Sequence, residues 1–163
     1  MIVRLCKTVL VATVALFFIL VALGNITDYG TNGEFVRHVL AMDTIFPNSP
    51  LASRAITNPG VVALVYRLII AWEAAAAVVL VVAAARLAAA SGDGAIFVAM
   101  KPLAVLGLTM GLLLYGLGFI VVGGEWFAMW QSASWNGVEA AARFVLLDGL
   151  VLLIVLLPEA GQT

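Results

Sequence analysis

The chain has 163 residues, of which 64% are hydrophobic and 10% are charged, and its mean hydropathy is +1.17. Because soluble domains carry about 25% charged residues, this composition excludes a soluble globular protein and indicates an integral membrane protein. The formal net charge of −1 leaves no basic excess, so no nucleic-acid partner is expected. The single cysteine, Cys6, has no second cysteine with which to form an internal disulfide.

Four apolar runs are long enough to cross the hydrocarbon core of a bilayer, which takes roughly 20 helical residues. They are residues 5–23, 61–85, 102–122 and 138–157. Since lipid offers the backbone no hydrogen-bond partner, each run is expected to be helical, and no proline is expected to interrupt the interior of a helix. The predicted fold class is therefore all-α, with residues 1–163 forming a single four-helix transmembrane bundle.

The first run has an alternative interpretation as a signal peptide. Arg4 and Lys7 precede it, and the small residues at 22–24 resemble a cleavage site. The length of the uninterrupted apolar run favours a retained membrane span.

Basic residues in the short connections predict the orientation of the bundle. Arg37 and Arg54 lie in a long connection on one side of the predicted membrane. The other side is flanked, across short segments, by Arg4, Lys7, Arg86 and Lys101. The positive-inside rule then predicts cytoplasmic termini and places the loops 25–60 and 123–137 on the outer side.

The first outer loop is predicted to contain a short amphipathic helix. Thr31 and Glu34 have capping-box spacing, and the apolar residues after them recur with a helical period up to Phe46. Such a helix is expected to lie on the bilayer surface or to cap the bundle. The sequences Asn-Ser-Pro at 48–50 and Thr-Asn-Pro at 57–59 are typical of helix starts, because a capping residue precedes a proline.

Ionisable residues inside the predicted spans are the main candidates for a functional cluster. They are Arg67, Glu73, Glu139, Arg143 and Asp148. A charge near the bilayer centre costs a few kcal/mol on insertion scales, so such groups are usually paired or functional. Structural ion pairs are the first interpretation, and Glu139 and Arg143 have the i, i+4 spacing of a helical pair. The alternatives are a proton or ion path through Glu73 and Asp148 and a pocket for a polar headgroup or a quinone.

Aromatic residues crowd into the second outer loop. They are Trp126, Phe127, Trp130 and Trp135. Trp126 and Trp130 are expected to be i, i+4 neighbours on a short interfacial helix, with Trp135 at the mouth of the fourth span. Tryptophan at the headgroup level anchors membrane proteins, so anchoring is the first interpretation, and a partner-docking surface and a ligand site are the alternatives.

Glycines in the third run predict close helix packing. Gly107, Gly111 and Gly118 fall on one helical face, and the first two have the GxxxG spacing that lets another backbone approach closely. Packing inside the bundle is favoured over a homodimer face.

Neither a catalytic motif nor a metal-ligand cluster occurs in the sequence. His38 is the only histidine, no group of His, Cys and acidic residues has metal-ligand spacing, and no nucleophile motif is present. No enzymatic activity, cofactor or metal site is therefore expected.

Three segments carry a resemblance to a known family. They are NITDYGTN (25–32), MDTIFPNSPLASRAI (42–56) and VVGGEWFAMWQSASWNG (121–137). They resemble the signature segments of a bacterial family of predicted small integral membrane proteins of unknown function. The resemblance implies four spans in the bacterial inner membrane and transfers no catalytic or binding residue.

Two functions remain open at this point. The first is an accessory or scaffolding subunit, without catalysis, that docks to a larger respiratory or photosynthetic inner-membrane complex through its outer loops. The second is a small transporter or a protein that binds a lipid, a quinone or a proton through Arg67, Glu73, Arg143 and Asp148. Four helices leave little room for alternating access, which weakens the transport interpretation.

Overall fold

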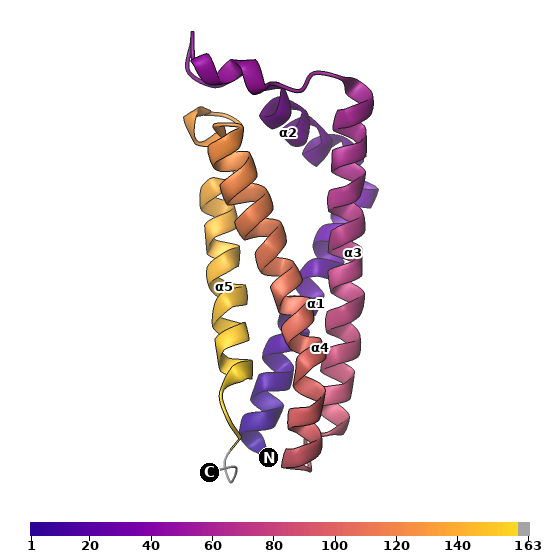
Figure 1. Cartoon of the computed structure of the whole chain (residues 1–163). Helices are drawn as coiled ribbons and strands as arrows, with labels where there is room; N and C mark the ends of the chain where they lie inside the picture. Colours follow the sequence, from indigo (N-terminus) through magenta and orange to yellow (C-terminus); the bar gives the residue numbers. More distant parts are fainter. Residues whose placement is uncertain (160–163) are drawn as a thin grey trace.

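The computed structural model describes residues 1–159, and each of its elements is helical. The long helices are α1 (Ile2–Thr27), α3 (Pro59–Ala89), α4 (Gly94–Leu112), which runs directly into η2 (Leu113–Trp126), and α5 (Val138–Leu156). Figure 1 shows these helices as an elongated bundle in which α1 begins and α5 ends at the same end. We name this the terminal end, and we name the opposite end, which carries the two long connections, the loop end.

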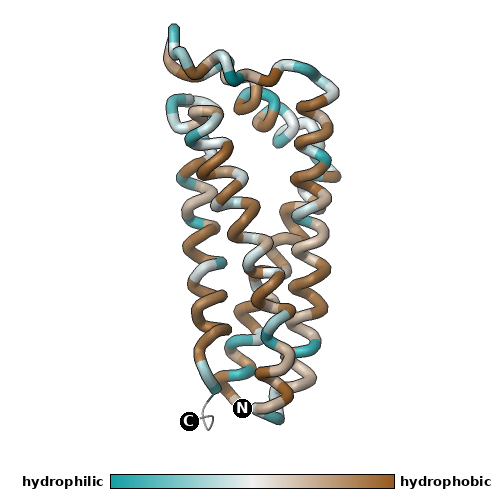
Figure 2. Tube along the Cα trace, in the orientation of Figure 1, coloured by the Kyte–Doolittle hydropathy of each residue, from teal (hydrophilic) through white to brown (hydrophobic). Residues whose placement is uncertain are grey.

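Among residues 1–159, three helices are long and apolar enough to cross a membrane. They are Ile2–Thr27, Pro59–Ala89 and the continuous rod Gly94–Trp126. Figure 2 shows hydrophobic residues along the helices and hydrophilic residues gathered mainly at the two ends. The fourth predicted span coincides with α5, whose 19 residues include Glu139, Arg143 and Asp148. Because of these three charges, α5 is not among the helices that length and composition alone identify as membrane spans.

The third long rod differs most from the prediction. It begins at Gly94, eight residues before the predicted start, because the Asp93 side chain caps it by accepting hydrogen bonds from the backbone N–H groups of Ala95 and Ile96. Pro102 consequently lies inside α4, so the expectation of proline-free helix interiors is wrong. The rod then continues as the π-helix η2, in which the wider winding changes which residues share a face. Hydropathy alone did not show that the helix runs on through Lys101, and it could not detect this change of winding.

The first long connection contains α2 (Tyr29–Ala41), followed by the short helix η1 (Pro50–Arg54). The cap of α2 is Asp28, whose side chain accepts from the backbone and hydroxyl of Thr31, rather than the predicted box at Thr31 and Glu34. The helix ends where Met42 adopts a left-handed backbone at φ 52°, so it stops before Phe46. The two predicted proline starts are confirmed: the side chains of Ser49 and Asn58 cap η1 and α3.

Packing divides the interior into two apolar clusters. The larger one lies between α1, α3, α4, η2 and α5. The smaller one, at the loop end, joins Val36 and Leu40 of α2 to Tyr66 of α3 and to Phe127 and Ala128 in the second loop. In Figure 1, α2 lies at the loop end between α3 and the α4–η2 rod. It therefore occupies the space that opens as α3 and η2 diverge.

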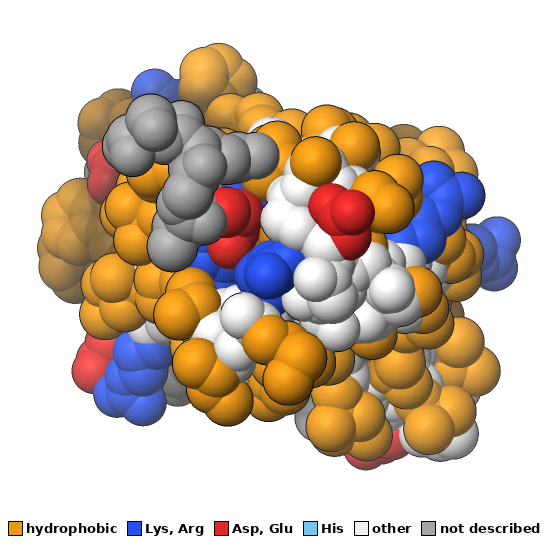
Figure 3. All heavy atoms as spheres, turned by 90° about the horizontal axis from the view of Figure 1, so that it is seen from below, with side chains coloured by type: hydrophobic (Ala, Val, Ile, Leu, Met, Phe, Trp, Pro, Cys, Tyr) orange, Lys and Arg blue, Asp and Glu red, His pale blue; other side chains and the backbone are white. Residues whose placement is uncertain are grey.

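A buried group of charges fastens α5 at the terminal end. The ammonium groups of Lys7 on α1 and Lys101 on α4 lie 2.7 Å and 2.6 Å from the same carboxylate oxygen of Glu159. Both also donate to the carbonyl oxygen of Leu157, at 2.7 Å and 2.8 Å. Burial alone raises the pKa of the Glu159 carboxyl, but the hydrogen bonds from Lys101 and Lys7 outweigh it and hold that pKa below its ordinary value. Figure 3, which looks onto this end, shows basic and acidic side chains close together among hydrophobic ones.

Candidate functional site

A cavity of about 360 Å³ lies in the loop half of the bundle, where α1, α2, α3, η2 and α5 meet. We name it the Glu73 cavity. Its wall is mostly apolar, and six of its 15 lining residues are aromatic: the rings of Phe17 and Phe144 lie 3.6 Å apart between centroids, and Tyr115 lies 4.4 Å from Phe144. Phe119 continues this wall along η2, 5.3 Å from Tyr115. The cavity can therefore hold an apolar or flat molecule rather than a chain of water.

One side of the Glu73 cavity is polar, and Asn25 is the hub of its hydrogen bonds. The Asn25 amide nitrogen donates to Glu73 Oε2 at 2.7 Å. The Asn25 carbonyl oxygen accepts from the Asn32 amide at 2.7 Å and from the Tyr66 hydroxyl at 3.3 Å. Four side chains from α1, α2 and α3 are thus joined into one network, and the orientation of each depends on the others.

Glu73 enters this network without a cationic partner. It is 2% exposed, and within residues 1–159 its carboxylate forms no ion pair. A buried carboxyl group surrounded by apolar side chains is costly unless hydrogen bonds satisfy it. Asn25 satisfies one oxygen, and in the same described range neither the other Glu73 oxygen nor the Tyr115 hydroxyl has a hydrogen-bond partner. These two groups are the ones that remain for a ligand in the cavity.

Two further apolar hollows, open at the surface between α3 and η2, adjoin the Glu73 cavity. A second pocket of about 200 Å³ lies between α2, α3 and η2 and shares Phe35, Val36, Ile69 and Phe119 with the cavity. A groove on the surface between α3 and η2 shares Ile69 with both. The divergence of α3 and η2 around α2 produces this side opening. A lipid-soluble molecule could enter from the bilayer without crossing a polar surface.

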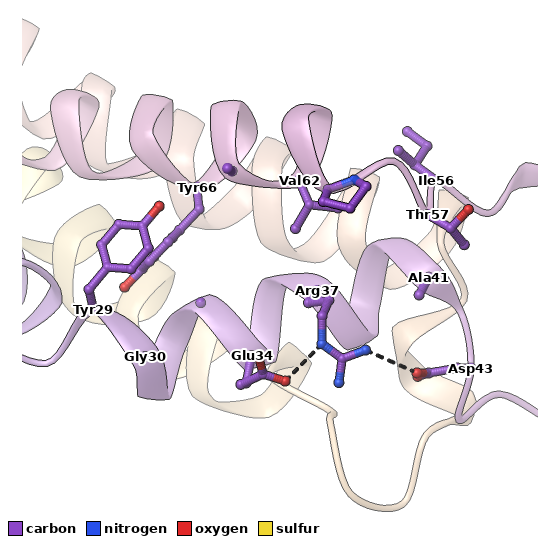
Figure 4. Close-up of a pocket in the computed structure, with 13 residues that line it drawn as sticks. Tyr29, Gly30, Glu34, Arg37, Ala41, Asp43, Ile56, Thr57, Val62 and Tyr66 are labelled. Atoms are coloured by element: carbon purple, nitrogen blue, oxygen red, sulfur yellow. Dashed lines mark hydrogen bonds and ion pairs between the residues drawn. The ribbon is translucent and has the colours of Figure 1, made fainter.

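Another pocket, of about 520 Å³, lies at the loop end between α2 and α3 and is a weaker candidate. Figure 4 shows Arg37 in this pocket between Glu34 and Asp43. The guanidinium is 2.8 Å from Glu34 and 3.6 Å from Asp43, so its charge is already matched by acids of the same segment. The ring of Tyr66 separates this pocket from the Glu73 cavity, since it lines both.

The predicted set of intramembrane charges is divided by the structure into separate places. Arg67 is exposed on α3 and forms no ion pair within the described residues. Glu139 and Arg143 pair at 2.6 Å, as their spacing predicted, but on the surface, with side chains 82% and 76% exposed. Glu73 and Asp148 are both buried, and neither meets an arginine. The idea of one cluster joining these acids to arginines is therefore wrong, because Arg67 and Arg143 point away from the bundle interior.

The tryptophans of the second loop each meet a residue of the first loop. Arg54 lies 4.5 Å from the ring centroid of Trp126 and donates to its carbonyl oxygen. Trp130 contacts Phe46 edge-on at 5.8 Å, and Trp135 stacks on His38 at 4.4 Å. The two loops are also joined by a hydrogen bond of 2.7 Å between Thr44 and Ser132. The aromatic density therefore serves contact between the loops.

Two details of the aromatic prediction need correction. Trp126 and Trp130 do not share a helix, because Ala128 has a left-handed backbone at φ 52° between η2 and the short helix η3 (Met129–Gln131). Phe127 is only 6% exposed and belongs to the smaller apolar cluster, so it offers no surface for docking. Trp126 and Trp130 remain 55% and 48% exposed.

The three predicted packing glycines have different surroundings. Gly107 lies against Leu80 and Val79 of α3, and Gly111 lies against Asp148 of α5 and Phe18 of α1. Gly118 has only atoms of its own η2 turn nearby. Close packing inside the bundle thus involves two of the three glycines. The π-helical winding between Gly111 and Gly118 rotates the third away from this contact.

The residues that the sequence did not single out are Asn25, Asn32 and Tyr66. Asn25 and Asn32 are seven residues apart and both lie in the signature segment at 25–32, so a signal was present. Their role depends on Glu73, which is 48 positions beyond Asn25 in the chain. No local pattern connects residues at that separation.

Comparison with known proteins adds one assignment. A family model described as predicted small integral membrane protein (DUF2165) matches residues 3–158. No curated protein and no solved structure matches the chain. Since the match covers nearly the whole sequence, the chain belongs to this family of predicted small integral membrane proteins.

Proposed function

We propose that this protein binds a lipid-soluble molecule with a small polar head in the Glu73 cavity, without catalysing a reaction. The observation that carries the proposal is a mostly apolar cavity, rich in aromatic rings, with a single polar side where Glu73 and Tyr115 retain hydrogen-bonding capacity. Ligand sites are typically apolar with a few convergent polar groups, and this cavity has that composition.

The chemistry of the polar side favours a carbonyl or hydroxyl head, as in a quinone or quinol. The Tyr115 hydroxyl can donate to a carbonyl oxygen, and the second Glu73 oxygen can accept from a hydroxyl. A flat ring would lie against Phe17 and Phe144, and its apolar tail would follow the opening between α3 and η2. A phosphate head is disfavoured, since no basic side chain lines the cavity.

A thermal-stability measurement on the purified protein tests this proposal. A short-chain quinone at about 100 times its Kd should add roughly 2.7 kcal/mol of stability, while a phospholipid added in its place should add none. The variants Glu73→Gln and Tyr115→Phe should bind the quinone more weakly, with an apparent Kd at least about tenfold higher, and should therefore be stabilised less at the same quinone concentration. The matched control is Glu139→Gln, which changes an exposed acid. Binding in this cavity would be contradicted if the quinone stabilised all variants equally, or if it did not stabilise the wild-type protein.

The proposal places all four long helices across the bilayer. At about 1.5 Å per residue, a helix of the length of α5 is close to the thickness of the hydrocarbon core. Lys7 and Lys101 at the terminal end support cytoplasmic termini in a bacterial inner membrane.

Docking to a larger respiratory or photosynthetic membrane complex is the second candidate. It is favoured by Trp126 and Trp130, which are half exposed on loops that hold each other in place through Arg54 and Phe46. Exposed tryptophan on a rigid support is typical of interaction surfaces. Purification in mild detergent should then yield a stoichiometric partner that the double variant Trp126→Ala/Trp130→Ala loses. A wild-type protein that purifies alone or as a homo-oligomer would exclude this role.

A further inference from the structure

Asp148 lies in the middle of α5 and is completely buried. Its exposed fraction is 0%, and it sits where α5 packs against α1 and α4. The carboxyl group lies over Gly111 of α4, and the ring of Phe18 of α1 covers the same point. Aromatic contacts from Phe18 to Tyr115 and Phe144 close the side toward the Glu73 cavity.

Both oxygens of Asp148 lack a hydrogen-bond partner among the described residues. The ionisable residues on the helices that pack against α5 do not reach it. Cys6 and Glu125 are exposed, Lys7 and Lys101 bond to Glu159 and Leu157, and Arg4 and Tyr115 form no bond to it. On α5 itself, Glu139 and Arg143 pair with each other on the surface.

A carboxylate in these surroundings would be far costlier than a neutral carboxylic acid. Moving an ionised carboxylate into an apolar interior without a partner costs so much that such a group takes up a proton instead. A metal ion cannot neutralise the Asp148 carboxylate here, because it needs several oxygen ligands. No group of three His, Cys, Asp or Glu residues that could bind one occurs in the described range. A proton is the one cation that fits between Gly111, Phe18 and the carboxyl group.

We propose that Asp148 is an intramembrane proton-binding site that holds its proton at neutral pH while α5 is closed against Gly111 and Phe18. Ionisation requires a partner or water, and either could reach the carboxyl only if α5 separates from α4 and α1. Proton release is thereby linked to opening of this contact. The site is independent of the ligand proposed for the Glu73 cavity, so either proposal can fail alone.

Infrared spectroscopy of the full-length protein in lipid nanodiscs at neutral pH tests the proposal directly. A neutral carboxylic acid has a carbonyl stretching band that a carboxylate lacks. That band should disappear in Asp148→Asn and persist in the control Glu139→Gln. If Asp148→Asn does not fold, wild-type protein with ¹³C-labelled aspartate should show the band shifted, since the other three aspartates, Asp28, Asp43 and Asp93, are exposed to solvent rather than buried. An unchanged carboxylic-acid region in the variant or in the labelled protein would overturn the assignment.

Thermal unfolding across pH gives an independent readout. In the unfolded chain an aspartate loses its proton above about pH 4, whereas in the folded chain Asp148 keeps it. The folded state therefore binds more protons, and wild-type stability should fall as pH rises. Asparagine stays neutral in both states, so the Tm of Asp148→Asn minus that of the wild type should increase by several degrees between pH 5 and pH 7. A difference that is constant with pH would count against a bound proton.

Discussion

Replacement of Gly111 by alanine is expected to destabilise the protein by about 2 kcal/mol, since overpacking a filled core costs roughly 1–3 kcal/mol and the gain in helix propensity offsets only part of it. An added Cβ would collide with the Asp148 carboxyl and would lie 3.1 Å from the Phe18 ring. Both neighbours are fully buried, so neither can move into free space. The loss of stability can be measured by unfolding the purified protein in detergent with heat or with denaturant.

The matched control for this prediction is Gly118→Ala in the same rod. A Cβ at Gly118 would meet only ordinary contacts, at 3.8 Å and 4.0 Å, within its own turn of η2. This variant should match or slightly exceed the wild type, because alanine favours a helix by up to about 1 kcal/mol over glycine. Equal behaviour of the two variants would show that α5 does not pack on Gly111 as the structure has it.

Substitution of Asn25 by leucine should cost more, about 3–5 kcal/mol, because Asn25 is the one hydrogen-bond donor within residues 1–159 that reaches the buried Glu73 carboxyl group. The change keeps the number and branching of the side-chain heavy atoms but leaves Glu73 without its partner. It also leaves the amide of Asn32 and the hydroxyl of Tyr66 without their acceptor. The same unfolding measurement reports the loss.

Two further variants distinguish the loss of the Asn25 hydrogen bonds from a general effect of substitutions in α1. Thr27→Val, two residues along the same helix, removes an exposed hydroxyl that bonds only to the helix backbone, so its effect should be near zero. The double variant Asn25→Leu/Glu73→Met should recover part of the stability, since replacing both partners by apolar groups leaves no carboxyl group unsatisfied. A double variant less stable than Asn25→Leu would argue against the Asn25–Glu73 bond as the cause.

The helices themselves could be predicted because their causes are local. A run of about 20 apolar residues must be helical in lipid, and capping residues such as Asn58 act on the backbone only two or three positions away. The Glu139–Arg143 pair was predictable for the same reason, since the helix brings positions four apart together. The true start of α4 was missed because Lys101 interrupts the apolar sequence, although the helix extends back from it to Gly94, where Asp93 caps it.

The site could be predicted only in part. Glu73 and Asp148 were identified because any acid inside an apolar helix is conspicuous, but the residues around them were not. Asn25 meets Glu73 because of the rotation of α1 against α3, and Asp148 meets Gly111 because of the rotation of α5 against α4. The arginines expected as their partners lie on the outward faces of the same helices.

By itself, the sequence determined that this is a helical membrane protein, roughly where its long helices lie, that Asn58 caps α3 and which acids lie within the helices. These properties depend on hydropathy and on hydrogen bonds that reach a few residues along one segment. The tertiary structure alone decided that Asn25 satisfies Glu73, that the tryptophans join the two loops, that Asp148 has no partner among the described residues and that apolar hollows open between α3 and η2. Each of these depends on the rotation and divergence of helices relative to one another, which is set by packing over the whole bundle and has no local signature in the chain.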